Sequence, residues 1–180
     1  MNVVSILMKH LDEAILVKVH EQSHYRPGNK GSNYTLILCI QIVKEKGVFS
    51  YELIKGGLET KSFYNFLSSF KVPPNENHHL IMDNLSVHRA KQSCLDLNLL
   101  PIKELLKSKR VIPIYLPAYT PQLNPVELCF NFLRQHIEKH QPRTFEELKY
   151  FIDQAMEILN QKDLTSYFKS CLNYYSKNGH

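Results

Sequence analysis

Apolar residues near the start of the chain recur in the patterns of β-strands. Residues 34–43 (YTLILCIQIV) form a nearly continuous apolar, β-branched run, and residues 48–54 (VFSYELI) alternate before they stop at Gly56-Gly57. The turn-forming residues 44–47 separate the two runs by a short connection. Two such runs with a short turn between them predict a β-hairpin.

The next segments predict a helix followed by two more strands. In residues 59–70 (ETKSFYNFLSSF) aromatic and aliphatic residues recur at helical spacing, and Pro73-Pro74 ends the pattern. Residues 78–84 (HHLIMDN) predict a short strand that ends at an aspartate. Residues 90–108 have a helical pattern that Pro101 must break or kink. Residues 110–117 (RVIPIYLP) predict another buried strand.

From Pro125 onward the pattern is helical. One face of the first helix carries apolar residues at positions 126, 129, 130, 133 and 137. A second helix begins at Thr144, which has the spacing of a capping box with Glu147. Residues 166–180 predict a short final helix. Strands first, a helix between them and helices last indicate a mixed α/β layer fold without an internal repeat.

Composition places the chain among ordinary globular proteins. It has 180 residues, 43% of them hydrophobic, and a net charge of +5, which fits a polyanionic partner without requiring one. Its four cysteines lie far apart among apolar neighbours, which favours buried reduced thiols and an intracellular location. The chain contains no signal-peptide pattern and no apolar run long enough to span a membrane.

Residues 81–88 (IMDNLSVH) place polar groups at the end of a predicted strand. Asp83 follows the strand directly, Asn84 adds an amide, and His88 lies five residues after Asp83. The C-terminal edge of a sheet is where α/β folds commonly build their sites. A purely local alternative is that Asp83 and Asn84 start a turn or cap the next helix.

Residues 116–130 (LPAYTPQLNPVELCF) deliver Glu127 to the first turn of the predicted helix. Asn124 has the position of an N-cap, and Pro125 and Glu127 suit the first and third helical positions, so helix capping alone explains the glutamate. Capping does not explain the prolines at 117, 121 and 125. Prolines stiffen the loop and define its path, which matters most when a side chain must reach one particular place.

Together, MDNLSVH and LPAYTPQLNPVE resemble the catalytic core of DDE transposases of the Tc1/mariner and IS630 type. Members of that superfamily carry an Asp-Asn-x-x-x-His segment after a strand, and later a loop similar to Leu-Pro-Pro-Tyr-Ser-Pro-x-Leu-Asn-Pro-Ile-Glu. This chain differs conservatively, by Ala118, Thr120 and Val126. The resemblance extends over residues 28–160.

The resemblance implies an RNase H-like mixed sheet flanked by helices and a nuclease site of three carboxylates. In such sites two divalent ions, Mg²⁺ or Mn²⁺, promote in-line displacement at a phosphodiester. Carboxylates suit these hard cations better than thiols or imidazoles do. Mapped onto this chain, Asp83 is the second carboxylate and Glu127 the third. His88 is expected to position a phosphate or a metal-bound water.

The family's first carboxylate is an aspartate, usually followed by glutamate, on the first strand. Asp12-Glu13 matches this dipeptide, and ILVKV after it can form a strand, which makes Asp12 the candidate for the first carboxylate and for a metal ligand. An alternative is that residues 4–15 form a helix with Asp12 on its surface. Without a first carboxylate the site would hold metal poorly, and the chain would be an inactive remnant.

The resemblance also implies organisation and partners. Residues 1–140 are expected to form the DDE core, truncated at its N-terminus, and residues 141–180 a helical extension packed on that core. The family carries an N-terminal helix-turn-helix region, and we expect this chain to be a fragment, a truncated copy or a retained remnant. DNA is the implied partner; no membrane is involved, a homodimer is allowed, and a eukaryotic source would place the protein in the nucleus.

Two other functions follow from the residues. An RNase H-like shell that has lost its activity would be a nucleic-acid-binding protein derived from a transposase. HEQSH at residues 20–24 fits the zinc-peptidase motif H-E-x-x-H. That motif requires a helix, whereas here it follows a strand-like run and precedes Pro27-Gly28, which favours the transposase interpretation.

Overall fold

The protein is described by a computed structural model. It describes residues 14–23, 33–41, 47–73, 77–117 and 120–178.

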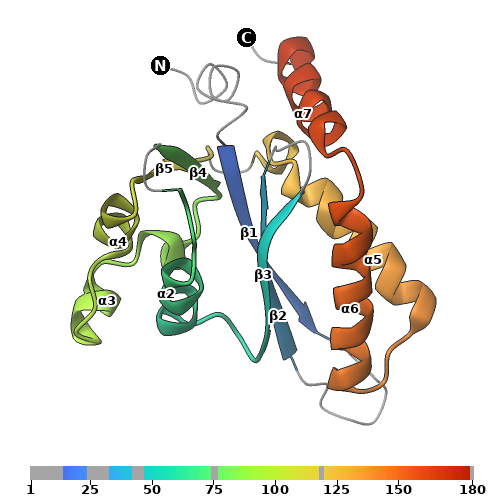
Figure 1. The fold of residues 1–180 in the computed structure, drawn as a ribbon, viewed down its shortest axis with the longest axis horizontal. Helices are drawn as coiled ribbons and strands as arrows, with labels where there is room; N and C mark the ends of the chain where they lie inside the picture. Colours follow the sequence, from blue (N-terminus) through green and yellow to red (C-terminus); the bar gives the residue numbers. More distant parts are fainter. Residues whose placement is uncertain (1–13, 24–32, 42–46, 74–76, 118–119, 179–180) are drawn as a thin grey trace.

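A five-stranded mixed sheet forms the centre of the molecule, with strand order β3-β2-β1-β4-β5 (Figure 1). Its strands pair antiparallel between β1, β2 and β3, and parallel between β1, β4 and β5. The mixed sheet and the β2–β3 hairpin confirm the strand predictions. The strands are β1 (Ala14–Ser23), β2 (Asn33–Gln41), β3 (Val48–Lys55), β4 (His78–Met82) and β5 (Val111–Tyr115).

Helices cover both faces of this sheet. Within the 90–108 segment the helix is interrupted at Pro101, as the sequence predicts, and the final helix predicted within residues 166–180 is present over Thr165–Asn178. The helices are α2 (Thr60–Ser68), α3 (Gln92–Asp96), α4 (Ile102–Ser108), α5 (Val126–His140), α6 (Phe145–Asn160) and α7 (Thr165–Asn178), with short 3-10 helices η2 (Ser86–Arg89) and η3 (Pro121–Leu123).

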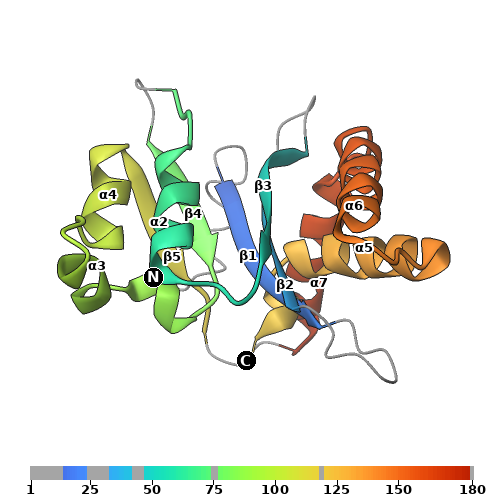
Figure 2. The same ribbon diagram turned by 90° about the horizontal axis from the view of Figure 1, so that it is seen from below.

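Strand β2 shows how the sheet is buried on both faces. Leu36 and Leu38 belong to a hydrophobic cluster shared with α5, α6 and α7, whereas Ile37 and Cys39 belong to a second cluster shared with α2, α3 and α4. Successive side chains of a strand point to opposite faces, so a continuous apolar run is the pattern of a strand covered on both sides. Figure 2 shows the resulting three layers, with α2–α4 and α5–α7 on opposite sides of the sheet.

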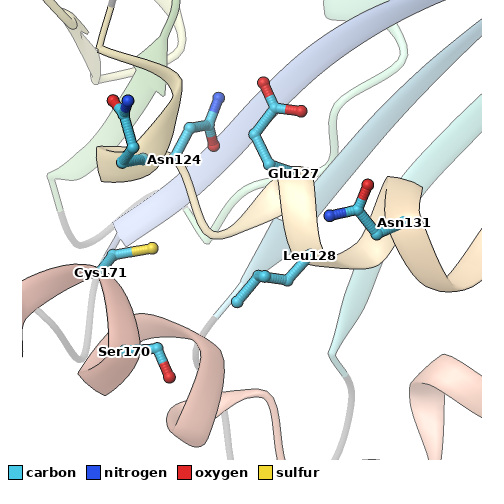
Figure 3. A pocket seen from close by; sticks show the side chains of 7 residues that line it. Asn124, Glu127, Leu128, Asn131, Ser170 and Cys171 are labelled. Atoms are coloured by element: carbon cyan, nitrogen blue, oxygen red, sulfur yellow. The ribbon is translucent and has the colours of Figure 1, made fainter. Parts of the chain in front are cut away.

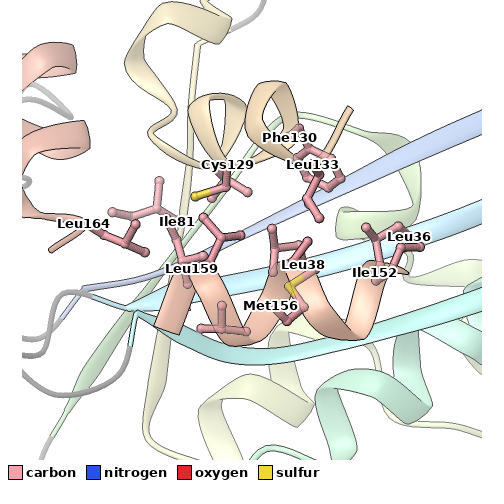
Figure 4. Close-up of a cluster of buried hydrophobic side chains, with 14 of the residues drawn as sticks. Leu36, Leu38, Ile81, Cys129, Phe130, Leu133, Ile152, Met156, Leu159 and Leu164 are labelled. Carbon is pink, nitrogen blue, oxygen red and sulfur yellow. The ribbon is translucent and has the colours of Figure 1, made fainter. Parts of the chain in front are cut away.

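The α5 side of the sheet holds the larger cluster, in which α5 and α6 pack over β2 and β4 (Figure 4). The apolar face predicted for α5 is buried at all of its positions: Val126, Cys129, Phe130, Leu133 and Ile137. Thr144 and Glu147 form the predicted capping box at the start of α6. These features confirm the predicted start of the second helix as well as the buried face of the first.

All four cysteines are free and buried, as predicted. Burial raises the pKa of every one of their thiols, to about 12 for Cys129 and to about 11 for Cys171. Within the described residues, no helix combines the length and the apolar character needed to cross a bilayer.

We predict that Leu133→Ala lowers the free energy of unfolding by about 3 kcal/mol, because it opens a cavity between α5 and the sheet. Leu133 is 1% exposed, whereas Leu100, in the connection between α3 and α4, is 54% exposed. Leu100→Ala is therefore the control and should change the free energy by less than about 0.5 kcal/mol. Urea titrations measure both values, and equal effects would contradict the packing described for α5.

Candidate functional site

Asp83 lies where β4 ends, beside the end of β5. The two strands run parallel with Met82 opposite Tyr115, and the Leu116 amide donates a hydrogen bond of 2.8 Å to the Met82 carbonyl. Parallel strands end at the same edge of a sheet, so side chains that follow β4 and β5 lie together. The strand-end position predicted for Asp83 is thereby confirmed.

The carboxylate of Asp83 is held by His88. His88 Nδ1 lies 2.9 Å from Oδ1 and 3.1 Å from the carbonyl oxygen of the same aspartate. Both neighbours of Nδ1 are acceptors, so we assign a proton to Nδ1. A longer bond of 3.4 Å from the Leu85 amide also reaches Oδ1. Asp83 therefore both starts the local turn and presents a carboxylate that is anchored through one oxygen.

His88 itself is completely buried. Its ring is 0% exposed and lies tilted against the ring of Phe63 of α2, with a centroid distance of 4.6 Å. The expected role of His88 in positioning a phosphate or a metal-bound water stays a prediction. The ring contacts Asp83, whose side chain remains 32% exposed. His88 therefore contacts the Asp83 carboxylate from the buried side and orients it.

Glu127 occupies the first turn of α5, as predicted. Asn124 is 2% exposed, and its Oδ1 accepts a hydrogen bond of 3.2 Å from the Val126 amide, so it caps the helix. The Glu127 amide donates a hydrogen bond of 3.0 Å to the Asn124 carbonyl. The stiff loop thus ends in a capped helix start that defines the position of Glu127 on the backbone.

A pocket of about 380 Å³ separates this helix start from α7. Figure 3 shows that the Glu127 carboxylate points away from Ser170 and Cys171, which lie on the α7 side. The pocket is therefore a feature of the junction between α5 and α7. Its lining residues are Gln122, Asn124, Glu127, Leu128, Asn131, Ser170 and Cys171.

The end of β4, which Asp83 follows, and the start of α5, which carries Glu127, lie toward the same edge of the sheet. Figures 1 and 2 show α5 beginning on the side of the molecule where β4 and β5 end. Loop residues Leu116 and Leu123 pack in the same cluster as Ile81 of β4 and Val126 of α5, which ties this loop to the strand ends. The carboxylates of Asp83 and Glu127 supply the hard oxygen donors that Mg²⁺ and Mn²⁺ prefer. Among the described residues, however, no group of three or more His, Cys, Asp or Glu side chains is arranged to hold a metal.

Asp12, the expected first carboxylate, lies outside the described residues. The ILVKV segment after it forms part of β1, which confirms the strand predicted there. In the β1–β4 pair, Ala14 is opposite His79 and Val17 is opposite Met82, so the part of β1 next to the end of β4 follows Val17. The residues there are Lys18, Val19 and His20, none of them acidic.

The zinc-peptidase interpretation fails on secondary structure. Residues 20–23 of HEQSH belong to β1, whereas the motif must place its two histidines one helical turn apart. His24 lies outside the described part of the chain.

Sequence reasoning missed two residues beside Asp83. The Tyr115 hydroxyl donates a hydrogen bond of 3.1 Å to the His88 carbonyl, and the Arg89 guanidinium lies 4.4 Å from the centre of the Tyr115 ring. A signal for Tyr115 was available, because it is the last residue of a predicted strand and therefore reaches the same edge as Asp83. Arg89 follows His88 directly, but no pattern in the sequence indicates that it stacks on Tyr115.

Comparison with protein families identifies the chain. A family model described as DDE superfamily endonuclease matches residues 20–149, so the chain belongs to this family. This confirms the resemblance drawn from the DNLSVH and LPAYTPQLNPVE segments. No curated protein sequence matches the chain.

Solved structures with the same fold are complexes of a mariner transposase. The Mos1 mariner paired-end complex with Mn matches with a TM-score of 0.67 at 13% identity, over 99% of this chain and 60% of that chain. The Mos1 paired-end complex with the left transposon end matches with a TM-score of 0.62 at 17% identity, over 97% of this chain and 57% of that chain. These likenesses confirm the RNase H-like fold, and this chain spans about 60% of the length of the Mos1 chain.

We predict that His88→Phe weakens Mn²⁺ binding by about tenfold, because outer hydrogen bonds that orient a ligating carboxylate contribute about that much. Phenylalanine keeps a ring against Phe63 and removes the hydrogen bond to Asp83. Titration of the Mn²⁺ signal by electron paramagnetic resonance measures the affinity.

The matched control is His78→Phe, which replaces a second buried histidine, 8% exposed, at the other end of β4. It should leave Mn²⁺ affinity unchanged. Equal affinities for wild type and His88→Phe would contradict the orienting role of His88.

Proposed function

We propose that this chain is the catalytic domain of a Tc1/mariner-type transposase, which cleaves DNA phosphodiesters and joins the freed ends to target DNA with Mg²⁺ or Mn²⁺. The observation that carries the proposal is the anchored Asp83 at the end of β4, in a chain of the DDE superfamily endonuclease family. Glu127 lies in the first turn of α5, which begins toward the same edge. Asp12 remains the residue predicted to supply the first carboxylate of the metal site.

In this proposal His88, Asp83 and Glu127 have different roles. His88 holds Oδ1 of Asp83, and within the described residues no hydrogen bond occupies Oδ2, so this oxygen is available to a cation. Glu127 is carried by the capped first turn of α5, which limits its backbone motion. When bound, a pair of divalent ions activates the attacking water or 3′-hydroxyl and stabilises the leaving oxygen. The protein's contribution is to orient its carboxylates before the substrate arrives.

The Mos1 comparisons support DNA as the partner and a divalent metal as the cofactor. Their titles name a paired-end complex with Mn, a left transposon end and a strand transfer complex. The net charge of +5 agrees with a polyanionic partner. A homodimer, the boundary at residue 140 and the choice between Mg²⁺ and Mn²⁺ remain predictions.

One observation favours a second candidate, a DNA-binding protein that has lost its nuclease activity. The β1 positions beside the end of β4 hold Lys18 and His20, the register partners of Leu38 and Leu36, and these two leucines pack in the cluster under α5. A DDE site needs a carboxylate at this edge from the first strand. If Asp12 does not supply it, the chain binds DNA without cutting it.

A nicking assay tests the proposed activity. We expect the chain to nick supercoiled plasmid in the presence of Mg²⁺ or Mn²⁺. Both Asp83→Asn and Glu127→Gln should abolish nicking, because each removes a charged ligand while keeping the shape of the side chain. Circular dichroism serves as the control for an intact fold. Retained nicking in purified Asp83→Asn would overturn the assignment of Asp83.

A thermal-shift measurement separates the two candidates. We predict that about 10 mM Mg²⁺ or Mn²⁺ raises the midpoint of unfolding by about 2–4 °C, because a cation neutralises carboxylates that otherwise repel each other. Asp83→Asn should abolish the rise. A wild-type chain that binds DNA but shows neither this rise nor nicking supports the non-catalytic candidate and contradicts the intact metal site.

A further inference from the structure

Arg89 forms a fixed positive group beside the candidate site. It is the last residue of η2, which begins three residues after Asp83, and its guanidinium carbon lies 4.4 Å from the centre of the Tyr115 ring. A guanidinium over an aromatic face is attracted by the negative charge of the ring face. The stack therefore limits the positions that this long side chain can take.

The stack is connected to Asp83 through a hydrogen bond to His88 and through the close contact of His88 with the carboxylate. Tyr115 donates its hydroxyl to the His88 carbonyl at 3.1 Å, and His88 Nδ1 contacts Asp83 Oδ1 at 2.9 Å. The backbone adds a third link, because Met82 and Tyr115 are paired in the parallel β4–β5 ladder. The positive charge of Arg89 is thus held at a defined place relative to the carboxylate of Asp83.

The charge of Arg89 is available to a ligand. The side chain is exposed. The guanidinium carries five N–H donors in a fixed fork, and none of them forms a salt bridge with a carboxylate of the described residues. Burial raises the pKa of Tyr115, and the nearby Arg89 charge lowers it, which agrees with close contact between the two groups.

We propose that Arg89, supported by Tyr115, binds a backbone phosphate of the DNA strand that reaches the Asp83 edge. Parallel N–H donors of a guanidinium match two oxygens of one phosphate, so the contact is bidentate. Such a contact offsets the repulsion between DNA and the carboxylates of the site. The inference rests on the proposed function, because it takes DNA as the substrate.

Equilibrium binding to DNA tests the inference without any cleavage. The probe is a fluorescently labelled 30-base-pair duplex of arbitrary sequence in a buffer with EDTA, and fluorescence anisotropy gives Kd from about 50 to 200 mM salt. Loss of one phosphate contact should weaken binding about tenfold at 50 mM salt and about fourfold at 150 mM. Arg89→Ala should show these losses, and its slope of log K against log salt should be shallower by about one.

Three further variants separate a placed guanidinium from charge in general. Lys107→Ala removes an exposed positive charge from the last turn of α4, which leads into the opposite end of β5, and should change Kd by less than about twofold. Tyr115→Phe keeps the ring under the guanidinium and removes only the hydrogen bond to the His88 carbonyl, so it should lose far less affinity than Arg89→Ala does. Tyr115→Leu removes the ring and should lose most of what Arg89→Ala loses, with circular dichroism confirming that it folds.

The outcomes distinguish this inference from the proposed function. A wild-type chain that does not bind the duplex at any salt concentration overturns the proposed function and this inference with it. If wild type binds and Arg89→Ala binds equally well, or Lys107→Ala loses as much affinity, only the phosphate contact is wrong. A tenfold loss confined to Arg89→Ala and Tyr115→Leu supports it.

Discussion

The parallel pairing of β4 with β5 is the constraint on which the rest of the site depends. Because Met82 stands opposite Tyr115, the residues that follow β4 meet the end of β5, and Asp83, His88, Arg89 and Tyr115 become one connected group. A shift of one residue in this register would turn the side chains of β4 to the opposite face and break every one of these contacts. The buried clusters on both faces make such a shift costly, so the hydrophobic core sets the geometry of the polar edge.

His88 lowers the stability of the fold at the edge of the sheet where Asp83 lies. Its Nε2 atom is buried, and no described residue forms a hydrogen bond with it. An unsatisfied buried polar atom costs about 1–3 kcal/mol. An apolar ring would pack against Phe63 at no such cost. What the histidine adds is a hydrogen bond to the Asp83 carbonyl and a 2.9 Å contact between Nδ1 and Oδ1, which holds one carboxylate oxygen and leaves the other for a ligand. This exchange of stability for orientation is typical of functional sites.

Much of this arrangement could be predicted from local patterns, and the rest depended on contacts between distant segments. The apolar run of β2, the break at Pro101, the capping box at Thr144 and the strand end at Asp83 are all encoded within a few residues. The burial of His88 was not predictable, because it comes from Phe63, a residue of a different helix. The stacking of Arg89 on Tyr115 likewise required the β4–β5 register. The register of β1 against β4 could not be predicted from the sequence either. It brings Lys18 and His20, rather than an acidic residue, beside the end of β4.

The central claim is that Asp83 and Glu127, from a strand end and a helix start far apart in the sequence, bind the same divalent ion. The most direct test is a crystal of the chain soaked in MnCl₂, with diffraction data collected at a wavelength where manganese scatters anomalously. The account predicts an anomalous peak within bonding distance of carboxylate oxygens of both residues. A peak on one carboxylate alone, or none in a well-diffracting crystal, would contradict it.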